Sequence, residues 1–456
     1  MNDVLYRYGD ELSSDAAAQG LAMKAPRVIE DTGLGRDLLC DLSARILFRA
    51  GRSTLAALAA GMRLPPSVVS EVLVFMRGEQ LVEMVGHGSL EIEAQFQLTA
   101  GGQRFASAAF DRCQYVGPAP VALADYSAQV NRHSMRHVTI NASYVRQAFS
   151  GLVVAPEVVD QMGAAMNSGR AILVYGPAGS GKTFLAEHLA ALQPGCIPVP
   201  YSIMVCGEII QMFDPLIHDV VVSEADNNMI RSDRDERWQW CRRPVVIAGG
   251  ELTLQMLDLQ FDPATRYYQA PPHLKANGGV FVVDDLGRQL VSPRDLMNRW
   301  IVPLDRSRDY LSLHTGFKFS LPFEMTVIFS TNLKPTELAD EAFLRRFGYK
   351  VYLGPLSLPD YRRIFEEACR QMNVEFDPAG FEWLIEHRHR KERRDLLACY
   401  PRDLVGRVSD MAIYHDSPGK ASAEALAKAW ATYFTTTSTV SIAGFEDNPN
   451  DKGTPQ

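Results

Sequence analysis

Residues 176–183 read Gly-Pro-Ala-Gly-Ser-Gly-Lys-Thr, and this stretch decides the fold. Its glycines, lysine and threonine have the spacing of a phosphate-binding loop. Glycine lets the backbone turn tightly enough for several N–H groups to point at one anion. The residues predicted to contact the phosphates are Gly176, Pro177, Ala178, Gly179, Ser180, Gly181, Lys182, Thr183 and Phe184.

The flanking residues support this interpretation. Ala171–Tyr175 is a short apolar run typical of a buried parallel strand, and residues 183–190 carry apolar side chains at helical spacing. A helix beginning near Gly181 would add the positive end of its dipole to the phosphate site. Lys182 would reach the β- and γ-phosphates, and the Thr183 hydroxyl would bind Mg²⁺. The pattern therefore predicts ATP and Mg²⁺ as ligands.

Polar side chains follow two further apolar strands. Residues 278–283 lead into Asp284 and Asp285, and residues 326–331 lead into Asn332. A carboxylate at a strand end that faces the phosphate loop can hold Mg²⁺, and we assign this role to Asp284. Asp285 is then the candidate general base for water. The Asn332 amide can hydrogen-bond the γ-phosphate or the water beside it.

These elements, followed by arginines in residues 340–347 and 400–404, resemble an AAA+ ATPase over roughly residues 140–435. By this resemblance Asn332 is sensor 1, and Arg346 or Arg345 is the arginine finger. Arg402 is sensor 2 in a helical lid. The resemblance implies a homo-oligomeric ring, with a hexamer expected, because the nucleotide lies between subunits. A guanidinium supplied by the neighbour would neutralise charge on the transferring phosphoryl group.

The chain departs from this family at Asp285, where a glutamate is usual. The shorter aspartate holds its carboxylate further back from the phosphates. Two interpretations follow from this difference: an ATPase with slow turnover, or a nucleotide-gated scaffold that hydrolyses almost no ATP.

A β-hairpin is predicted at residues 309–322, because apolar residues alternate on both sides of Thr315 and Gly316. A hairpin before sensor 1 resembles the MoxR-type chaperone branch and several DNA-acting branches of the AAA+ family, where it points into the central pore. His314, Phe317 and Lys318 would then touch a substrate. The alternative is a hairpin that packs on its own domain.

Residues 35–106 resemble a winged helix, with helices predicted at 37–49, 53–60 and 67–78 and strands at 81–85 and 92–98. The balance of basic and acidic residues distinguishes between two possible partners of this domain, DNA and protein. The seven basic residues are Arg36, Arg45, Arg49, Arg52, Arg63, Arg77 and Arg104, and the seven acidic residues are Asp37, Asp41, Glu71, Glu79, Glu83, Glu91 and Glu93. Because duplex affinity comes largely from neutralising phosphates, this balance favours protein docking over DNA binding.

Composition indicates a cytoplasmic protein. The 456-residue chain has a net charge of −8, and its seven cysteines form neither a C-x-x-C pair nor a disulfide framework. The N-terminus does not resemble a signal peptide, and no apolar run is long enough for a membrane helix. Neither a membrane nor nucleic acid is favoured as a partner.

The predicted fold class is α/β, with an αβα sandwich around a parallel sheet, a C-terminal helical lid and an N-terminal winged helix. The predicted parts are a poorly ordered segment 1–34, a winged-helix-like domain 35–112, a linker 113–136, a nucleotide-binding domain 137–355, a helical lid 356–436 and a disordered tail 437–456. The expected function is ATP-driven remodelling or assembly of a protein partner. The alternatives are a DNA-directed ATPase, such as a helicase loader or regulator, and the scaffold described above.

Overall fold

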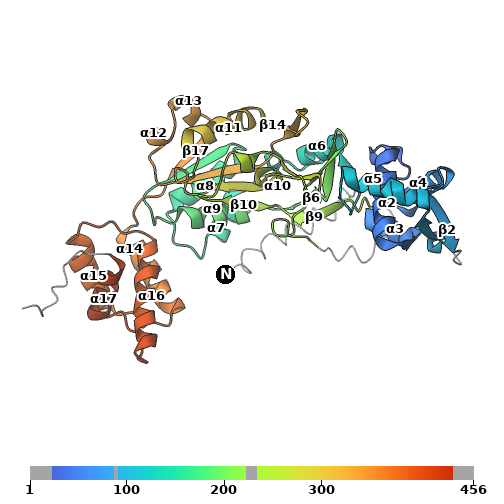
Figure 1. Ribbon diagram of the computed structural model, residues 1–456. Coiled ribbons are helices and arrows are strands. Elements are labelled where there is room, and N and C mark those ends of the chain that lie inside the picture. The colour runs from blue at the N-terminus through green and yellow to red at the C-terminus, as the bar shows by residue number, and fades with distance from the viewer. Residues whose placement is uncertain (1–22, 87–90, 222–233, 435–456) are drawn as a thin grey trace, which may run out of the picture. The chain divides into compact units, whose positions relative to one another are not determined.

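The computed structural model describes residues 23–86, 91–221 and 234–434 (Figure 1). The chain divides into two compact units, Met1–Gly354 and Pro355–Gln456. The predicted tail 437–456 and residues 1–22 of the predicted N-terminal segment lie outside the described residues.

A five-stranded parallel sheet forms the centre of the first unit. Its order is β10 (Val245–Ala248), β13 (Val280–Val283), β16 (Thr326–Thr331), β5 (Ala171–Tyr175) and β17 (Phe347–Tyr352). In the register, Val283 lies opposite Phe329, and Thr331 lies opposite Tyr175. The expected α/β fold with a parallel central sheet is confirmed.

Alternate residues of these strands build two cores, because successive side chains point to opposite faces of a sheet. Ile172 and Val174 lie in one core, with α7 (Ala142–Ala148), α8 (Pro156–Asn167) and α9 (Lys182–Ala191). Ala171 and Leu173 lie in the other, with α11 (Pro293–Arg306), α12 (Pro335–Leu338) and α13 (Glu341–Leu344). Figure 1 shows the sheet between α9 on one side and α11 on the other.

A second, mixed sheet takes four of its strands from the residues between α9 and β13, and its fifth strand, β4, from before the central sheet. Its order is β11 (Gln260–Asp262), β12 (Tyr267–Gln269), β8 (Glu208–Gln211), β7 (Ser202–Val205) and β4 (Val121–Ala122). Beside it lie the antiparallel pair β6 (Cys196–Pro200) and β9 (Trp238–Arg242), the short helix α10 (Pro272–Lys275) and α6 (Leu123–Arg132). The prediction of a linker at 113–136 is therefore wrong. Val121 and Tyr126 are buried in the core of this sheet, because the short β4 pairs with β7.

Residues 35–112, hereafter the N-terminal module, contain α2 (Arg36–Ala50), β1 (Arg52–Thr54), α3 (Leu55–Met62), α4 (Pro66–Gly78), β2 (Val82–Gly86), β3 (Gln95–Leu98) and α5 (Ala100–Arg112). The predicted second helix begins later than expected, since residues 52–54 pair with β3 and Thr54 caps α3. Among the described residues, no single helix is long and apolar enough to cross a membrane, and only the bent pair α3 and α4, at 112°, passes that test together.

Residues 23–34, hereafter the strap, correct the expectation of a poorly ordered N-terminal segment. Ile29 and Leu34 are buried in the core of the N-terminal module. The guanidinium of Arg237, just before β9, donates to the carbonyls of Thr32 (2.9 Å) and Pro120 (3.2 Å). Arg237 also forms a buried ion pair with Asp235 at 2.8 Å. The contact with Thr32 was not predictable locally, because Arg237 and Thr32 lie 205 positions apart in the chain.

The second unit is helical. It contains α14 (Leu358–Gln371), α15 (Pro378–Leu384), a π-helical turn (Ile385–Arg390), α16 (Cys399–Tyr414) and α17 (Ala423–Tyr433). Tyr361, Phe365, Leu404 and Trp430 are among the side chains that form its own core.

The Arg237–Asp235 pair yields a stability prediction. Replacing Arg237 with alanine leaves Asp235 buried and two carbonyls without a donor, so we expect the free energy of unfolding to fall by about 3–5 kcal/mol. The control is Arg63→Ala, because the Arg63–Glu236 pair is about 40% exposed and should contribute less than about 1 kcal/mol. Urea unfolding followed by tryptophan fluorescence measures both. Equal losses for the two variants would contradict the assigned role of Arg237.

Candidate functional site

The residues predicted from three separate stretches meet at the carboxyl edge of the central sheet. The phosphate loop follows β5, the two aspartates follow β13, and Asn332 follows β16. Because β16 lies between β13 and β5, the ends of these three parallel strands are neighbours. Thr183 donates a hydrogen bond to Asp284 at 2.8 Å, and Lys182 donates one to Asn332 at 2.6 Å.

The loop backbone requires its glycines. Gly179 and Gly181 have φ angles of +83° and +91°, in the region that side chains other than glycine rarely adopt. A Cβ on Gly176 would lie 2.0 Å from the carbonyl oxygen of Leu353, so only glycine fits there. The Ser180 side chain is buried, and its hydroxyl has no hydrogen-bond partner among the described residues.

The remaining predicted loop residues differ in exposure. Pro177 is half-buried and accepts a hydrogen bond from Lys182 through its carbonyl, whereas Ala178 is exposed at the turn. Phe184 lies in the first turn of α9, partly exposed, with its ring against that of His188. Neither Ala178 nor the Phe184 side chain forms a hydrogen bond with another predicted site residue among the described residues.

The Lys182 ammonium is buried and makes three hydrogen bonds. It donates to the carbonyls of Gly176 (3.2 Å) and Pro177 (2.9 Å) and to Asn332 Oδ1. Burial lowers its pKa below the usual lysine value, and the carboxylates of Asp285 and Asp284 partly oppose this shift. The cation is thus fixed at the mouth of the loop by acceptors that a phosphate oxygen could replace.

Thr183 and Asp284 fit a magnesium ion. One carboxylate oxygen of Asp284 accepts the Thr183 hydrogen bond, and the other is buried without a partner among the described residues. Hard oxygen donors of this kind suit Mg²⁺, which usually takes one or two protein oxygens and completes its shell with phosphates and water. Within the described part of the chain, no cluster of three or more His, Cys, Asp or Glu side chains could hold a metal by itself. The donors therefore fit an ion bound together with a nucleotide.

Asp285 is held by two neighbours. Asn332 Nδ2 donates to its carboxylate at 3.2 Å, and Arg288 forms an ion pair with it at 3.7 Å. Its backbone is left-handed, with φ of +49°, which is uncommon outside glycine and occurs at functional sites.

Sequence reasoning missed Arg288 and Gln289. The buried Gln289 side chain donates to the Asp284 carbonyl at 2.9 Å and accepts from the Gly287 N–H at 2.9 Å, which fixes the loop after β13. The signal available in the sequence was their position, three and four residues after Asp285.

Two of the predicted arginines, Arg345 and Arg346, lie away from the phosphate loop of their own chain. Arg346 immediately precedes β17, whose first residue pairs with Ala171, so it lies at the amino edge of the sheet. Arg346 forms a bidentate ion pair with Asp305 of α11, at 2.8 and 2.9 Å, and Arg345 is exposed beside Glu341. Arg402 lies near the start of α16 in the second unit, where it is exposed. Its guanidinium has no hydrogen-bond partner among the described residues.

The predicted hairpin exists as β14 (Arg308–Ser312) and β15 (Lys318–Pro322). Leu311, Leu313, Phe319 and Leu321 on its inner face are buried in the core of the second sheet. His314 stacks on Phe261 with ring centroids 4.2 Å apart, whereas Phe317 and Lys318 at the turn are exposed. The hairpin therefore packs on its own unit along one face and presents its turn to solvent.

Asp309 anchors the base of this hairpin. Its carboxylate accepts hydrogen bonds from His273 (2.8 Å) and from both Nη atoms of Arg299 (2.7 and 2.8 Å). Burial raises the pKa of Asp309, but these bonds outweigh it and lower the pKa to about 2. The hairpin is thus fixed to α10 and α11 by buried charge.

Comparisons with known proteins give limited similarity. Residues 357–432, in the second unit, match the family described as "Domain of unknown function (DUF8689)". No curated protein matches the chain in sequence.

Several solved structures are similar to the chain. The Holliday junction branch migration motor RuvB of Thermotoga maritima is 15% identical over 65% of this chain and 73% of its own, with a TM-score of 0.33. NtrX from Brucella abortus in complex with ADP is 15% identical over 75% of this chain and 69% of its own, with a TM-score of 0.39. The NtrX complex with ATP is 14% identical, at a TM-score of 0.37, and the match covers 73% of this chain and 63% of NtrX.

The Gly176 contact gives a test of the loop geometry. In a Gly176→Ala variant the Cβ would collide with the Leu353 carbonyl, so the loop must move and its N–H groups must lose alignment. We expect ATP affinity to fall at least about tenfold, equivalent to about 1.4 kcal/mol. The control is Gly151→Ala, where nothing lies within 4 Å of the added Cβ. Titration calorimetry measures both, and an unchanged affinity for Gly176→Ala would contradict this loop conformation.

Proposed function

We propose that this chain binds ATP with Mg²⁺ and hydrolyses it, as an AAA+ ATPase. One observation carries the proposal: hydrogen bonds join the phosphate loop, the aspartates after β13 and Asn332 after β16 into one site. A structural salt-bridge cluster does not explain the partnerless buried oxygens of Asp284 and Ser180, whereas a magnesium–phosphate ligand does.

Each residue has a role that follows from its position. Lys182 and the loop N–H groups bind the phosphates, and Thr183 with Asp284 would hold Mg²⁺, which supplies charge neutralisation at the phosphoryl group. Asn332 orients the attacking water or the γ-phosphate. Asp285 accepts a proton from that water once its carboxylate leaves Asn332 and Arg288.

The arginines support a site shared between subunits. Arg346 and Arg345 lie at the edge of the sheet opposite their own phosphate loop, so they cannot complete the site of the same chain. We propose a homo-oligomeric ring, of six subunits by the family resemblance, in which Arg346 leaves Asp305 and approaches the neighbour's ATP. The exposed Arg402 of the lid would act as sensor 2.

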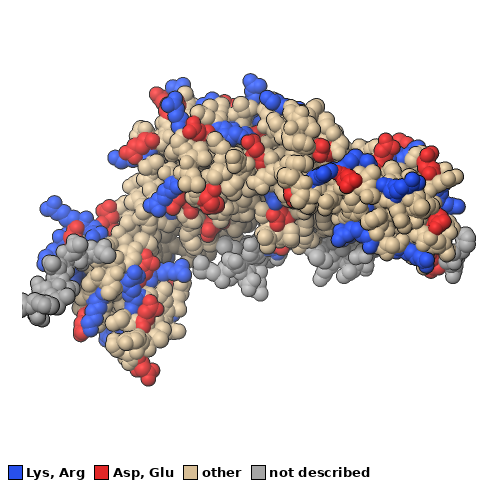
Figure 2. All heavy atoms as spheres, in the orientation of Figure 1, with Lys and Arg blue, Asp and Glu red and all other residues tan. Residues whose placement is uncertain are grey.

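For the partner, we propose a protein rather than DNA, with the N-terminal module as a winged-helix docking domain. Two polar side chains of α4, the helix that would enter a DNA groove, are engaged by the strap: Ser67 donates to the Arg27 carbonyl at 3.3 Å, and Glu71 accepts from the Ile29 N–H at 3.4 Å. Figure 2 shows acidic and basic side chains interspersed over the face of this module that is in view. Both observations support docking of a protein.

Two further features bear on this partner. The exposed turn of the hairpin, with Phe317 and Lys318, is the proposed contact with a remodelled substrate, as in the MoxR-type branch. The seven cysteines are all free thiols, which fits the proposed cytoplasmic location.

Turnover measurements test the proposal and distinguish it from the scaffold alternative. That alternative is favoured by the contacts of Asp285 with Asn332 and Arg288, because they hold the candidate base. Lys182→Ala should abolish ATP binding. Asp285→Asn should bind ATP but lose at least about 100-fold in kcat, the usual contribution of a general base. Asp285→Glu should raise kcat, because its carboxylate reaches further. Retained ATPase activity in Lys182→Ala would refute the assignment, and a wild-type kcat indistinguishable from that of Asp285→Asn would favour the scaffold.

Mixed assemblies test the shared site. Arg346→Ala should lose turnover but retain ATP binding, since the arginine acts on the neighbour's nucleotide. Mixing it with Asp285→Asn creates some interfaces with an intact base and an intact arginine, so activity should partly return. The matched control is Arg345→Ala, because comparing the two variants shows which arginine acts as the arginine finger. Mixtures without any recovery would show that subunits do not share catalysis.

A further inference from the structure

Arg288 lies beside the candidate base, three residues after Asp285. Its guanidinium is 3.7 Å from the Asp285 carboxylate, and 67% of the Arg288 side chain and 43% of the Asp285 side chain are exposed. An ion pair this exposed contributes little to stability, because water screens both charges. The stability of the loop therefore does not account for an arginine at this position.

The backbone that carries Arg288 is held firmly, whereas its side chain is not. Gly287 has a φ of +109°, a conformation that other residues rarely adopt, so the turn before Arg288 depends on this glycine. The buried Gln289 side chain, directly after Arg288, accepts from the Gly287 N–H and donates to the Asp284 carbonyl, each at 2.9 Å. A fixed backbone with a long, exposed side chain lets the guanidinium change its partner without any movement of the loop.

Three consecutive contacts connect Arg288 to the phosphate-binding lysine. Arg288 pairs with Asp285, Asp285 accepts a hydrogen bond from Asn332 at 3.2 Å, and Asn332 accepts one from Lys182 at 2.6 Å. Both ends of this series are cations, and the two groups between them are those expected beside the γ-phosphate. A phosphate bound by Lys182 would therefore lie in the same cluster of polar groups as the Arg288 guanidinium.

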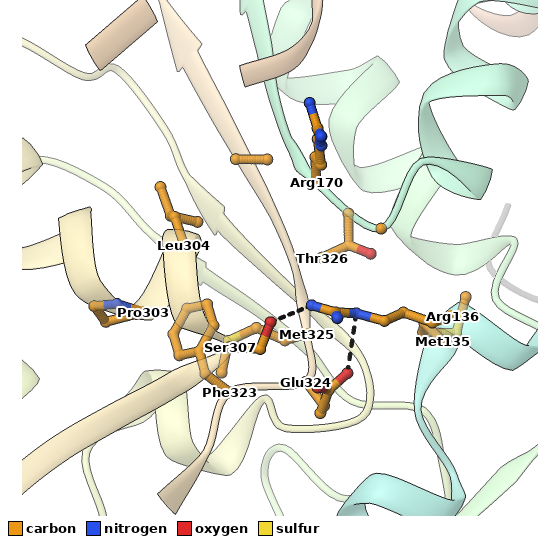
Figure 3. A pocket seen from close by; sticks show the side chains of 12 residues that line it. Met135, Arg136, Arg170, Pro303, Leu304, Ser307, Phe323, Glu324, Met325 and Thr326 are labelled. Atoms are coloured by element: carbon orange, nitrogen blue, oxygen red, sulfur yellow. Dashed lines mark hydrogen bonds and ion pairs between the residues drawn. The ribbon is translucent and has the colours of Figure 1, made fainter. Parts of the chain in front are cut away.

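Arginines at the opposite, amino edge of the central sheet cannot take this position in their own chain. Arg136 lies at that edge, close to Thr326, the first residue of β16. Figure 3 shows the Arg136 guanidinium bonded to Ser307 and Glu324. Arg288 instead follows the end of β13, so it lies at the carboxyl edge, where the phosphate loop also lies.

A γ-phosphate would compete well with Asp285 for this guanidinium. A terminal phosphate carries up to about two negative charges and three acceptor oxygens, whereas a carboxylate carries one charge and two oxygens. The planar guanidinium also matches a phosphate with two parallel N–H bonds. ADP has no γ-phosphate, so Arg288 would keep Asp285 as its partner in the ADP complex. A contact of this kind would therefore strengthen the binding of ATP and leave that of ADP unchanged.

We propose that Arg288 binds the γ-phosphate of the ATP held by its own chain, and that it thereby strengthens the binding of ATP relative to ADP. The inference rests on the proposed function, since it uses the phosphate loop as the site for ATP. It assigns a specificity-determining cation within each subunit, in addition to the arginine that the neighbour would supply.

Titration calorimetry of the full chain with Mg²⁺ tests the inference by comparing two ligands, ADP and a non-hydrolysable ATP analogue. Arg288→Ala should weaken binding of the analogue at least about tenfold, because a charge-assisted contact is lost, and should change ADP binding less than about twofold. Arg288→Lys should retain part of the preference, since lysine keeps the charge but not the planar fork. The matched control is Arg294→Ala, which removes an exposed arginine near the start of α11 and should bind both ligands like the wild type. Measuring at a chain concentration at which sedimentation shows a monomer excludes a contribution from a neighbour.

The outcomes distinguish the inference from the proposed function. If Arg288→Ala binds the analogue like the wild type, or weakens both ligands equally, the inference is overturned while nucleotide binding stands. An equal loss of preference in Arg294→Ala would also overturn it, since the effect would then come from the removal of surface charge alone. A wild-type chain that binds neither ligand overturns both.

Discussion

The position of β16 between β5 and β13 is the constraint on which the site depends. Each strand ends in a different chemical group, and only adjacent parallel ends can bring those groups within hydrogen-bond distance. The bonded pairs are far apart in the chain, 101 positions for Thr183 and Asp284 and 150 for Lys182 and Asn332. A slip of one residue in either pairing would turn these side chains to the other face of the sheet. The strand order thus places the two aspartates and the Asn332 amide, just as the glycines determine the backbone conformation of the phosphate loop.

The hydrogen bonds within the site also couple its parts. Lys182 has three donors and uses all of them, one on Asn332, and Asn332 in turn donates to Asp285. A phosphate that takes the Asn332 position on Lys182 would free that amide and loosen its hold on Asp285. On the proposed function, ligand binding and release of the candidate base would therefore be linked through one asparagine, Asn332. This link would allow the Asp285 carboxylate to leave its contacts with Asn332 and Arg288 and to approach the attacking water.

The sequence predicted those parts of the fold that depend on local spacing. The phosphate loop and the central strands were predictable because backbone conformation there follows from neighbouring residues, and because both faces of a covered strand are apolar. The segment 113–136 was mistaken for a linker since β4 is only two residues long and is stabilised by pairing with β7, far along the chain. The strap was missed for the same reason, because its partners Arg237 and Glu71 cannot be found from residues 23–34 alone. Within the site, the roles of Gln289 and Arg288 depend on the turn after β13, which the strand pattern does not specify.

A crystal structure with an ATP analogue and Mg²⁺ tests the central claim most directly. The account predicts phosphates enclosed by residues 176–183, with the Lys182 ammonium moved from Asn332 to a phosphate oxygen and with Mg²⁺ bound by Thr183 and facing the free oxygen of Asp284. Nucleotide bound elsewhere on the chain, or a Mg²⁺ ion bound near neither Thr183 nor Asp284, would contradict it.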